Sequence, residues 1–115
     1  MAVDYRRTGG IAGLSDHLFI DNSGRCTLER KNARFGFSLP AADLQELRGL
    51  FQQADFFNLK DSYLPEKMGA DLFTYVITYR TSGGEHTVTT MDMAVPPALM
   101  PVIIQLDKIV SDNSK

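Results

Sequence analysis

The spacing of apolar residues along this chain alternates between the period of a strand and the period of a helix. Apolar residues recur at every second position in short runs within residues 3–30, and residues 72–79 are mostly β-branched and aromatic, as in a strand. They recur at every third or fourth position over 44–54 and 99–110, as in amphipathic helices. Strands, a helix, strands and a second helix predict an α+β fold: an antiparallel β-sheet of four to five strands with two helices packed on one face.

Turn residues separate the predicted strands. Residues 8–10 end the first strand, and residues 21–24 close the second with Asp, Asn, Ser and Gly. Residues 81–84 form a turn before a returning strand at 85–91. Residues 31–37 show no clean period. We therefore interpret that segment as a loop or a ragged strand end.

Several single residues refine this prediction. Ala12 is expected on the apolar face of the second strand. Ser38 is expected to cap the first helix, and Pro96-Pro97 to begin the second. Between the helix and the next strand, either Phe56 or Phe57 is expected to tuck under the sheet, because the segment is too apolar for an exposed loop.

The chain has the size and composition of one domain. Its 115 residues are 43% apolar and 23% charged, and we expect a single α+β domain over residues 1–110 with a polar tail over 111–115. A net charge of −2 predicts neither a nucleic-acid nor a membrane partner. One cysteine, Cys26, cannot form an internal disulfide and fits either a reducing compartment or a protein indifferent to redox conditions. We expect a cytoplasmic monomer.

The residues able to carry chemistry do not form an enzyme's constellation. His17 and His86 lie far apart on predicted strands without ligand spacing, and Cys26 has no histidine near it in sequence. We therefore expect no catalytic residue, metal site or cofactor. Asp71 and Asp92 flank predicted strands, where capping of backbone amides is favoured over a contact role. These residues favour a binding module over an enzyme.

Two loops stand out by composition. Gly9-Gly10 and Gly83-Gly84 are both turn glycines by position, and a sharper interpretation is that glycine lets a partner backbone approach closely. The segment 8–13 is longer than a two-residue hairpin needs, which favours that interpretation there. Residues 60–71 are the longest stretch without a period, and such loops are often functional.

The order of short motifs is more specific than any one of them. The motifs are Tyr5–Gly13 (YRRTGGIAG), Ser38–Pro40, Ala54–Leu59 (ADFFNL), Ala70–Tyr75 (ADLFTY), His86–Val88 and Ala94–Leu99 (AVPPAL). In this order, over residues 5 to about 106, the chain resembles the emfourin (protealysin inhibitor) family of small bacterial and archaeal proteins. Thr8 stands where serine is common in that family, and residues 21–37 add a turn and a charged segment.

The resemblance implies an α+β protein without enzymatic activity that inhibits a thermolysin-like zinc metallopeptidase. Strand-end loops are then expected to enter the active-site cleft. Thr8, Gly9, Gly10, Ile11, Ala12 and Gly13 are the main candidates for the inserting loop. Asp71 and Asp92 are weaker candidates for a carboxylate near the target's metal or cationic groups. A non-enzymatic adaptor domain with another partner is the alternative.

Overall fold

The computed structural model of the protein describes residues 1–67, 69 and 71–114. Ala70 of the motif before the fourth predicted strand and Lys115 of the predicted tail lie outside the described residues. The elements are β1 (Ala2–Gly9), β2 (Leu14–Ile20), β3 (Arg25–Arg30), β4 (Ala33–Ser38), α1 (Ala41–Gln53), β5 (Ser62–Tyr63), β6 (Phe73–Thr81), β7 (Gly84–Met91) and α2 (Met100–Asp112). Short 3₁₀ turns, η1 (Phe56–Asn58) and η2 (Pro97–Leu99), follow α1 and precede α2.

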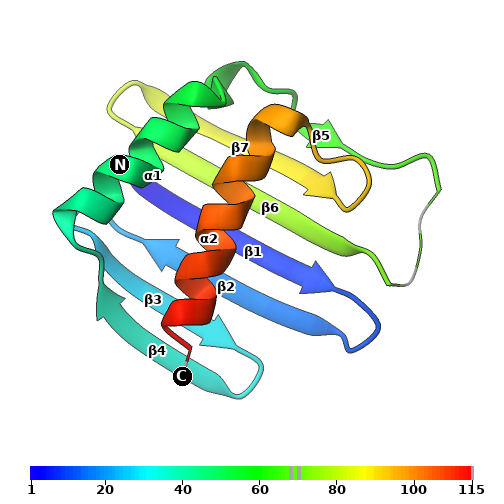
Figure 1. Cartoon of the computed structure of the whole chain (residues 1–115), viewed down its shortest axis with the longest axis horizontal. Helices are drawn as coiled ribbons and strands as arrows, with labels where there is room; N and C mark the ends of the chain where they lie inside the picture. Colours follow the sequence, from blue (N-terminus) through cyan, green and yellow to red (C-terminus); the bar gives the residue numbers. More distant parts are fainter. Residues whose placement is uncertain (68, 70, 115) are drawn as a thin grey trace.

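The strands form one mixed sheet in the order β4-β3-β2-β1-β6-β7-β5. All neighbours are antiparallel except β5 and β7, which run parallel. The N-terminal strand β1 lies in the middle, where Tyr5 is opposite Leu18 on one side and Ile77 on the other. Both helices cover one face, and the other face of the sheet is open (Figure 1). The α+β prediction with two helices on one face is confirmed.

The predicted strand number was too low, since the sheet has seven strands instead of four to five. Residues 33–38 form the regular edge strand β4, whereas we predicted a loop or a ragged strand end for 31–37. Phe35 and Phe37 are half-buried, while Gly36 between them lies against the guanidinium of Arg25. An edge strand with a glycine in the middle has a weak apolar alternation, so its period was missed. The two-residue strand β5 is too short to show any period.

Two local predictions were also wrong. Ser38 is the last residue of β4, and α1 begins after Pro40 without a side-chain cap. The Pro40 carbonyl instead accepts the amide of Asp43 at 3.0 Å. Ala12 lies in the turn before β2, exposed to solvent, because the left-handed conformations of Gly10 and Gly13 turn the chain around it.

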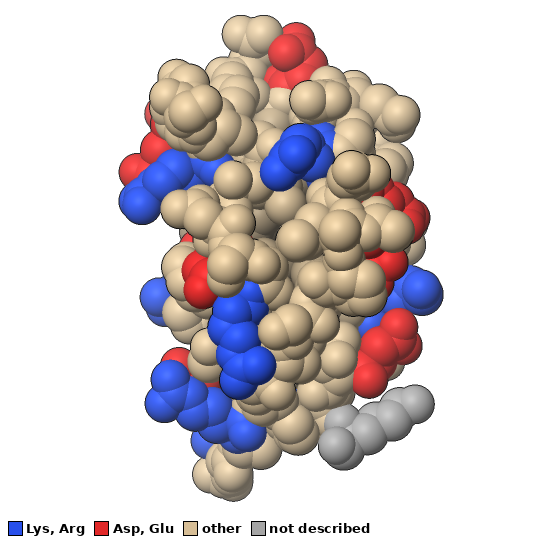
Figure 2. All heavy atoms as spheres, turned by 90° about the vertical axis from the view of Figure 1, so that its left-hand side faces the viewer, with Lys and Arg blue, Asp and Glu red and all other residues tan. Residues whose placement is uncertain are grey.

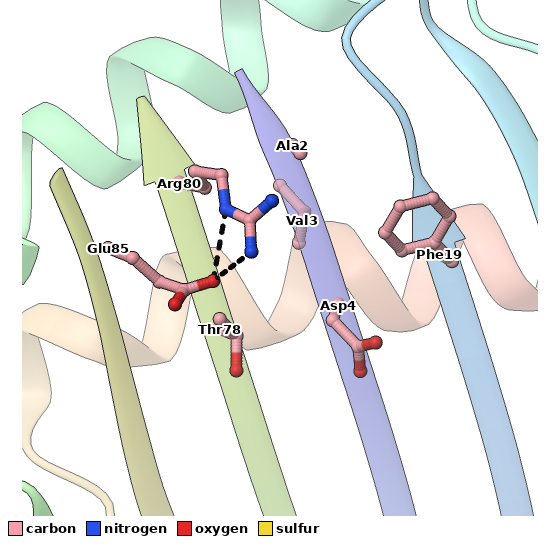
Figure 3. A pocket seen from close by; sticks show the side chains of 7 residues that line it. All are labelled: Ala2, Val3, Asp4, Phe19, Thr78, Arg80 and Glu85. Carbon is pink, nitrogen blue, oxygen red and sulfur yellow. Dashed lines mark hydrogen bonds and ion pairs between the residues drawn. The ribbon is translucent and has the colours of Figure 1, made fainter. Parts of the chain in front are cut away.

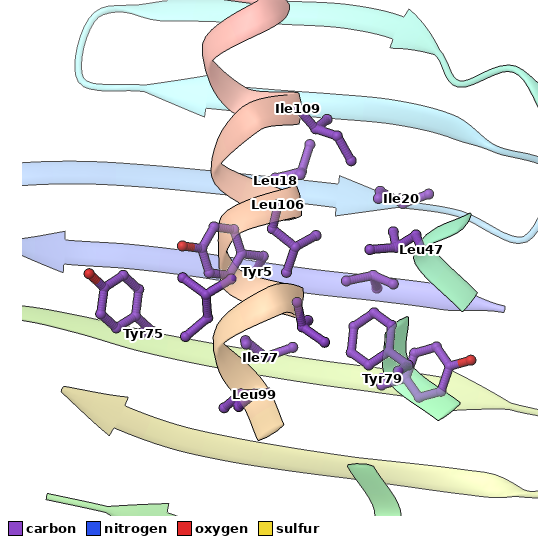
Figure 4. Close-up of a cluster of buried hydrophobic side chains, with 14 of the residues drawn as sticks. Tyr5, Leu18, Ile20, Leu47, Tyr75, Ile77, Tyr79, Leu99, Leu106 and Ile109 are labelled. Carbon is purple, nitrogen blue, oxygen red and sulfur yellow. The ribbon is translucent and has the colours of Figure 1, made fainter. Parts of the chain in front are cut away.

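The core lies between the helices and the sheet (Figure 4). The predicted stripe of the second helix is confirmed, since its six members are all buried: Leu99, Val102, Ile103, Leu106, Ile109 and Val110. From α1, Phe51 stacks on Tyr79 with ring centroids 4.0 Å apart. Phe56 is buried against both rings, whereas Phe57 is half exposed. Phe56 is therefore the phenylalanine that tucks under the sheet.

The helix α2 crosses the sheet from the β7 side to the β3 side (Figure 1). Its last turn reaches β3, where Arg30 donates a hydrogen bond to the Ser114 hydroxyl at 2.9 Å. Among the residues that the structure describes, no helix is long and apolar enough to cross a membrane.

Candidate functional site

One end of the sheet gathers the residues that the sequence analysis predicted for partner binding. The turn of residues 10–13 between β1 and β2, residues 71–72 before β6 and residues 92–96 after β7 lie at this end, which we call the loop end (Figure 1). Thr8 and Gly9 are the last residues of β1 there. Antiparallel pairing of β1 and β7 with β6 brings these segments together although they are far apart in the sequence.

The turn between β1 and β2 depends on its glycines. Gly9, Gly10 and Gly13 have φ angles of 110°, 75° and 65°, in the region that favours glycine. A Cβ on Gly9 would lie 2.6 Å from the Leu72 carbonyl oxygen, and one on Gly10 would lie 2.9 Å from ring atoms of Phe73. The Gly10 amide donates to the same Leu72 carbonyl at 3.2 Å. The close approach that these two glycines allow is therefore to β6 of this protein.

The tip of this turn faces solvent. Ile11, Ala12 and Gly13 are exposed, and the Ile11 side chain keeps 89% of its accessible surface. No described atom lies within 4 Å of the position where a Cβ on Gly13 would be. The Thr8 side chain is exposed as well. The turn thus has a base fixed by β6 and a free tip.

Asp92 holds the start of β6. One carboxylate oxygen accepts the Phe73 amide at 2.9 Å and the other accepts the Tyr75 hydroxyl at 2.7 Å. The Asp92 amide donates to the Phe73 carbonyl at 3.0 Å. Burial, with the negative charge of Asp92 beside it, raises the pKa of Tyr75 above its ordinary value. Asp92 is therefore a structural cap, as the sequence favoured, whereas Asp71 is exposed in the turn before β6.

A charged cluster lies behind the loop end, between the sheet and α2. The Arg7 guanidinium is 3.3 Å from the Asp107 carboxylate, 3.7 Å from that of Asp16, and 5.0 Å from the centre of the Phe73 ring. The Tyr5 hydroxyl donates to Asp107 at 2.5 Å. Burial, then the negative charge of Asp107, raises the pKa of Tyr5. The cluster joins β1, the start of β6 and α2 through groups that sequence reasoning did not select.

Asp16 extends this cluster to β3. It is 3% exposed, and its two carboxylate oxygens accept hydrogen bonds from Nε and Nη2 of Arg30 at 2.8 and 3.2 Å. That hydrogen bond raises the pKa of Arg30. In the sequence, Asp16 interrupts an otherwise apolar face of β2. A carboxylate at such a position is the signal that predicts a buried cationic partner.

Met93 is the residue at the loop end that sequence reasoning missed. It follows Asp92 in the turn after β7, has a φ of 72° and keeps 89% of its accessible surface. A non-glycine residue in this conformation is uncommon, and an unbranched apolar side chain gains nothing from it. The available signal was an apolar residue between a strand-ending aspartate and Pro96-Pro97.

The two histidines and the cysteine lie apart from each other. The His17 ring bonds to Asp4 at 3.0 Å on the open face, and the His86 ring bonds to the Leu59 carbonyl at 2.8 Å on the helix side. Cys26 is buried, which raises the pKa of its thiol to about 11. In the described part of the chain, no three residues of metal-ligating type come together.

Two hollows lie on the open face of the sheet, and the larger of them borders the loop end, because Ser15 in its lining pairs with Thr8. One, of about 150 Å³, is on the open face near the start of β1 and holds the ion pair of Arg80 and Glu85 at 2.6 Å (Figure 3). Another, of about 270 Å³, is lined by Arg6, Ser15, His17, Glu29, Arg30 and Lys31. The end of the sheet opposite the loop end presents charges of both signs (Figure 2).

Comparison with known proteins identifies the family. Residues 36–107 match the model of the Emfourin family, which is more than half of the chain. No curated protein matches the chain. The matched part includes Asp71, Asp92 and Met93. It begins after β1, the strand that lies next to β6 in the sheet. The chain belongs to the emfourin family, a family of protein inhibitors, and is not an enzyme.

Proposed function

We propose that this protein inhibits a thermolysin-like zinc metallopeptidase and that its loop end enters the active-site cleft of that enzyme. The emfourin family implies a metallopeptidase partner. The single observation that supports insertion at the loop end is the turn of residues 10–13. It has an exposed apolar tip and a base tied to Leu72, so it is a rigid projection beside an otherwise open sheet.

The conformation of this turn suits an inhibitor better than a substrate. A peptide bound in extended form adds to a strand of its partner and presents its scissile carbonyl. Residues 9 and 10 instead have positive φ, and the Gly13 amide bonds back to the Gly10 carbonyl at 3.2 Å. Such a turn fills a cleft without offering an extended peptide bond to the zinc-bound water of the peptidase. Because it is already ordered, little conformational entropy is lost on binding.

The two aspartates have different parts in this proposal. Asp71 is exposed, so its carboxylate is free to approach cationic groups or the metal of the target. Both carboxylate oxygens of Asp92 are already bonded to Phe73 and Tyr75. Asp92 therefore acts on the target indirectly, by fixing where β6 begins. The zinc belongs to the peptidase.

An inhibition assay with two variants tests this proposal. Purified protein is expected to inhibit a thermolysin-like peptidase stoichiometrically and to leave serine peptidases active. Thr8→Ala removes an exposed hydroxyl and methyl, so inhibition is expected to fall while the melting temperature holds within a few degrees. Gly10→Val is expected to weaken inhibition at least about tenfold, because valine meets the Phe73 ring and strains a positive φ.

Two results count against the proposal. Wild-type potency of both variants would remove the turn of residues 8–13 from the interface and leave Asp71 and Asp92 as its candidates. Inactivity of the wild-type protein at micromolar excess over a panel of thermolysin-like peptidases would favour the adaptor domain instead. Metal analysis of the protein alone is expected to find no stoichiometric zinc.

A further inference from the structure

We infer that Ile11 and Met93 form a pair of apolar anchors that enter two apolar subsites of the target cleft and decide which peptidases are inhibited. This inference rests on the proposed function and adds to it a second loop, the residues that set specificity and the chemistry of the subsites that receive them. Met93 lies outside every segment that the sequence analysis selected for partner contact.

The exposure of these two side chains separates them from the other apolar residues. Ile11 and Met93 each keep 89% of their accessible surface. The next most exposed large apolar residues that the structure describes are Ile104 at 61% and Leu64 at 50%. Single exposed apolar residues are ordinary on protein surfaces. Two almost fully exposed apolar side chains at the same end of one sheet are unusual, and burial by a partner would explain them.

The sheet sets the two anchors side by side with β6 between them. The Gly10 amide bonds to the Leu72 carbonyl on one side of β6, and the Asp92 amide bonds to the Phe73 carbonyl on the other. Ile11 and Met93 each come one residue after these bonded positions. Two strand spacings separate their backbones, which is about 10 Å. That separation fits neighbouring subsites in one cleft.

Both anchors have a fixed backbone. The Ala94 amide bonds to the Met91 carbonyl at 3.0 Å across the turn that holds Met93, and Asp92 is bonded at both carboxylate oxygens. Met93 keeps a side chain at a φ of 72°, where glycine is the favoured residue. Strain that persists in an exposed turn points to a use for the side chain. Binding then needs little ordering of either anchor.

The chemistry of the pair specifies its occupant. Neither side chain carries a charge or a hydrogen-bonding group, so the complementary surface is apolar, with room for a β-branched group at Ile11 and a longer, adaptable group at Met93. Each anchor has almost its whole apolar surface available for burial. Removing either is expected to weaken inhibition at least about tenfold, the effect of losing one well-buried aliphatic side chain.

The test compares five variants in the full-length protein. Ile11→Ser and Met93→Gly remove the anchors, Ile11→Leu and Met93→Leu keep an apolar side chain, and Ile104→Ser on the exposed side of α2 is the matched control. Inhibition constants are measured against a panel of thermolysin-like peptidases, with melting temperatures alongside. Ile11→Ser and Met93→Gly are expected to lose potency at least about tenfold, by different factors for different peptidases. Ile104→Ser is expected to match the wild-type protein. Ile11→Leu and Met93→Leu are expected to keep most of the potency.

Met93→Gly separates binding from folding most sharply. Glycine removes the anchor and also relieves the strained φ, so the melting temperature is expected to stay or rise while inhibition falls. A general loss of structure moves both quantities down together. Because inhibition is expected to fall without a fall in melting temperature, weaker folding cannot imitate the expected result.

The possible failures are distinguishable. A wild-type protein that inhibits no member of the panel overturns both the proposed function and this inference. A wild-type protein that inhibits, with Ile11→Ser and Met93→Gly equally potent, overturns the inference and leaves the proposed function standing. Light scattering of the free proteins measures whether they self-associate. A wild-type dimer that both substitutions dissociate, with inhibition unchanged, would assign the pair to a second copy and overturn the inference.

Discussion

The hairpin of β1 and β2 and the hairpin of β6 and β7 both turn on a pair of glycines, at opposite ends of the sheet, for different reasons. A Cβ on Gly9 would meet the Leu72 carbonyl oxygen at 2.6 Å, whereas the nearest atom to a Cβ on Gly83 is the Thr81 hydroxyl at 3.6 Å. The Thr81 hydroxyl accepts the Gly83 amide at 3.1 Å, so that turn is held by its own residues. The Gly9-Gly10 turn is held by a different strand.

This difference separates a local turn from a tertiary one. The sequence around Ser82 and Gly83 is sufficient to close a two-residue hairpin loop. The turn of residues 10–13 keeps its shape only while Leu72, the residue before β6, stays in place and Asp92 fixes the start of β6 at Phe73. A loop supported in this way is ordered before it meets a partner. The loop end is therefore preorganised by the fold, and the opposite end is a simple reversal of the chain.

The largest expected loss of stability comes from a substitution in the core, which serves as a reference for the two turns. Leu47 is fully buried on α1, and Leu47→Ala is expected to lower the free energy of unfolding by about 2–5 kcal/mol through the cavity it leaves. Urea denaturation measures the loss. Protein that remains folded should inhibit like the wild type, because the loop end is untouched. Lost inhibition with unchanged stability would mean that the α1 face is part of the interface.

Gly9→Ala is expected to have the next largest effect. A methyl group 2.6 Å from a backbone oxygen, at a φ of 110°, requires the turn or the start of β6 to move. We expect a loss of about 2 kcal/mol or more in the free energy of unfolding, from backbone strain and overpacking together. Hydrogen exchange should show faster exchange of the Gly10 and Asp92 amides. If alanine is tolerated, the turn is local and the comparison fails.

The third prediction concerns pH. The pKa of Tyr75 is raised in the folded state, so the folded protein keeps a proton that an unfolded tyrosine releases near pH 10. The stabilising effect is complete below that pH and is lost as the pH rises above it. Tyr75→Phe removes the hydrogen bond to Asp92 and is expected to cost about 1–2 kcal/mol at pH 8.

Urea midpoints at pH 8 and pH 10.5 measure this effect. The wild-type midpoint should fall between the two pH values, and that of Tyr75→Phe should fall less. Tyr5 and Tyr79, whose pKa values are also raised by burial, keep part of the dependence in the variant. If the urea midpoints of the two proteins fall equally between these pH values, the Tyr75 hydroxyl does not stabilise the loop end.

Gly83→Ala has the smallest expected effect and completes the comparison. A Cβ here would make only an ordinary contact with the Thr81 hydroxyl, and Gly83 has no left-handed φ, so the free energy of unfolding should change by less than about 0.5 kcal/mol. Inhibition should not change, because this hairpin lies at the opposite end of the sheet. A large loss of stability here would make the two glycine pairs equivalent.

Part of the loop end could be predicted from the sequence. The turn of residues 8–13 and the capping role of Asp92 followed from glycine spacing and from an aspartate at a strand end. The partners of Asp92, Phe73 and Tyr75, did not, because they come from another strand. Met93 was not predicted. Its one signal was an apolar residue between Asp92 and Pro96-Pro97, and that signal does not show its positive φ or its exposure.

By itself, the sequence determined the elements whose signal lies within one segment. The five buried residues of α2 and Leu99 of η2 repeat at helical spacing, and the residues of β6 alternate at strand spacing. Burial on one face of each segment therefore followed directly from the period. The α+β class followed in the same way, whereas only the structure decided that Phe56 and not Phe57 is buried. These are properties of short stretches of chain, which local spacing is able to record.

Only the tertiary structure decided how those elements meet. It placed β1 between β2 and β6, gave the half-buried edge strand β4 its partner, and brought Tyr5 to Asp107 and Arg7 to both Asp107 and Asp16. Such pairings depend on which distant groups satisfy a buried polar atom or an unpaired strand edge. No local period records them. The loop end, where the turns following β1 and β7 meet across β6, exists only because of those long-range pairings.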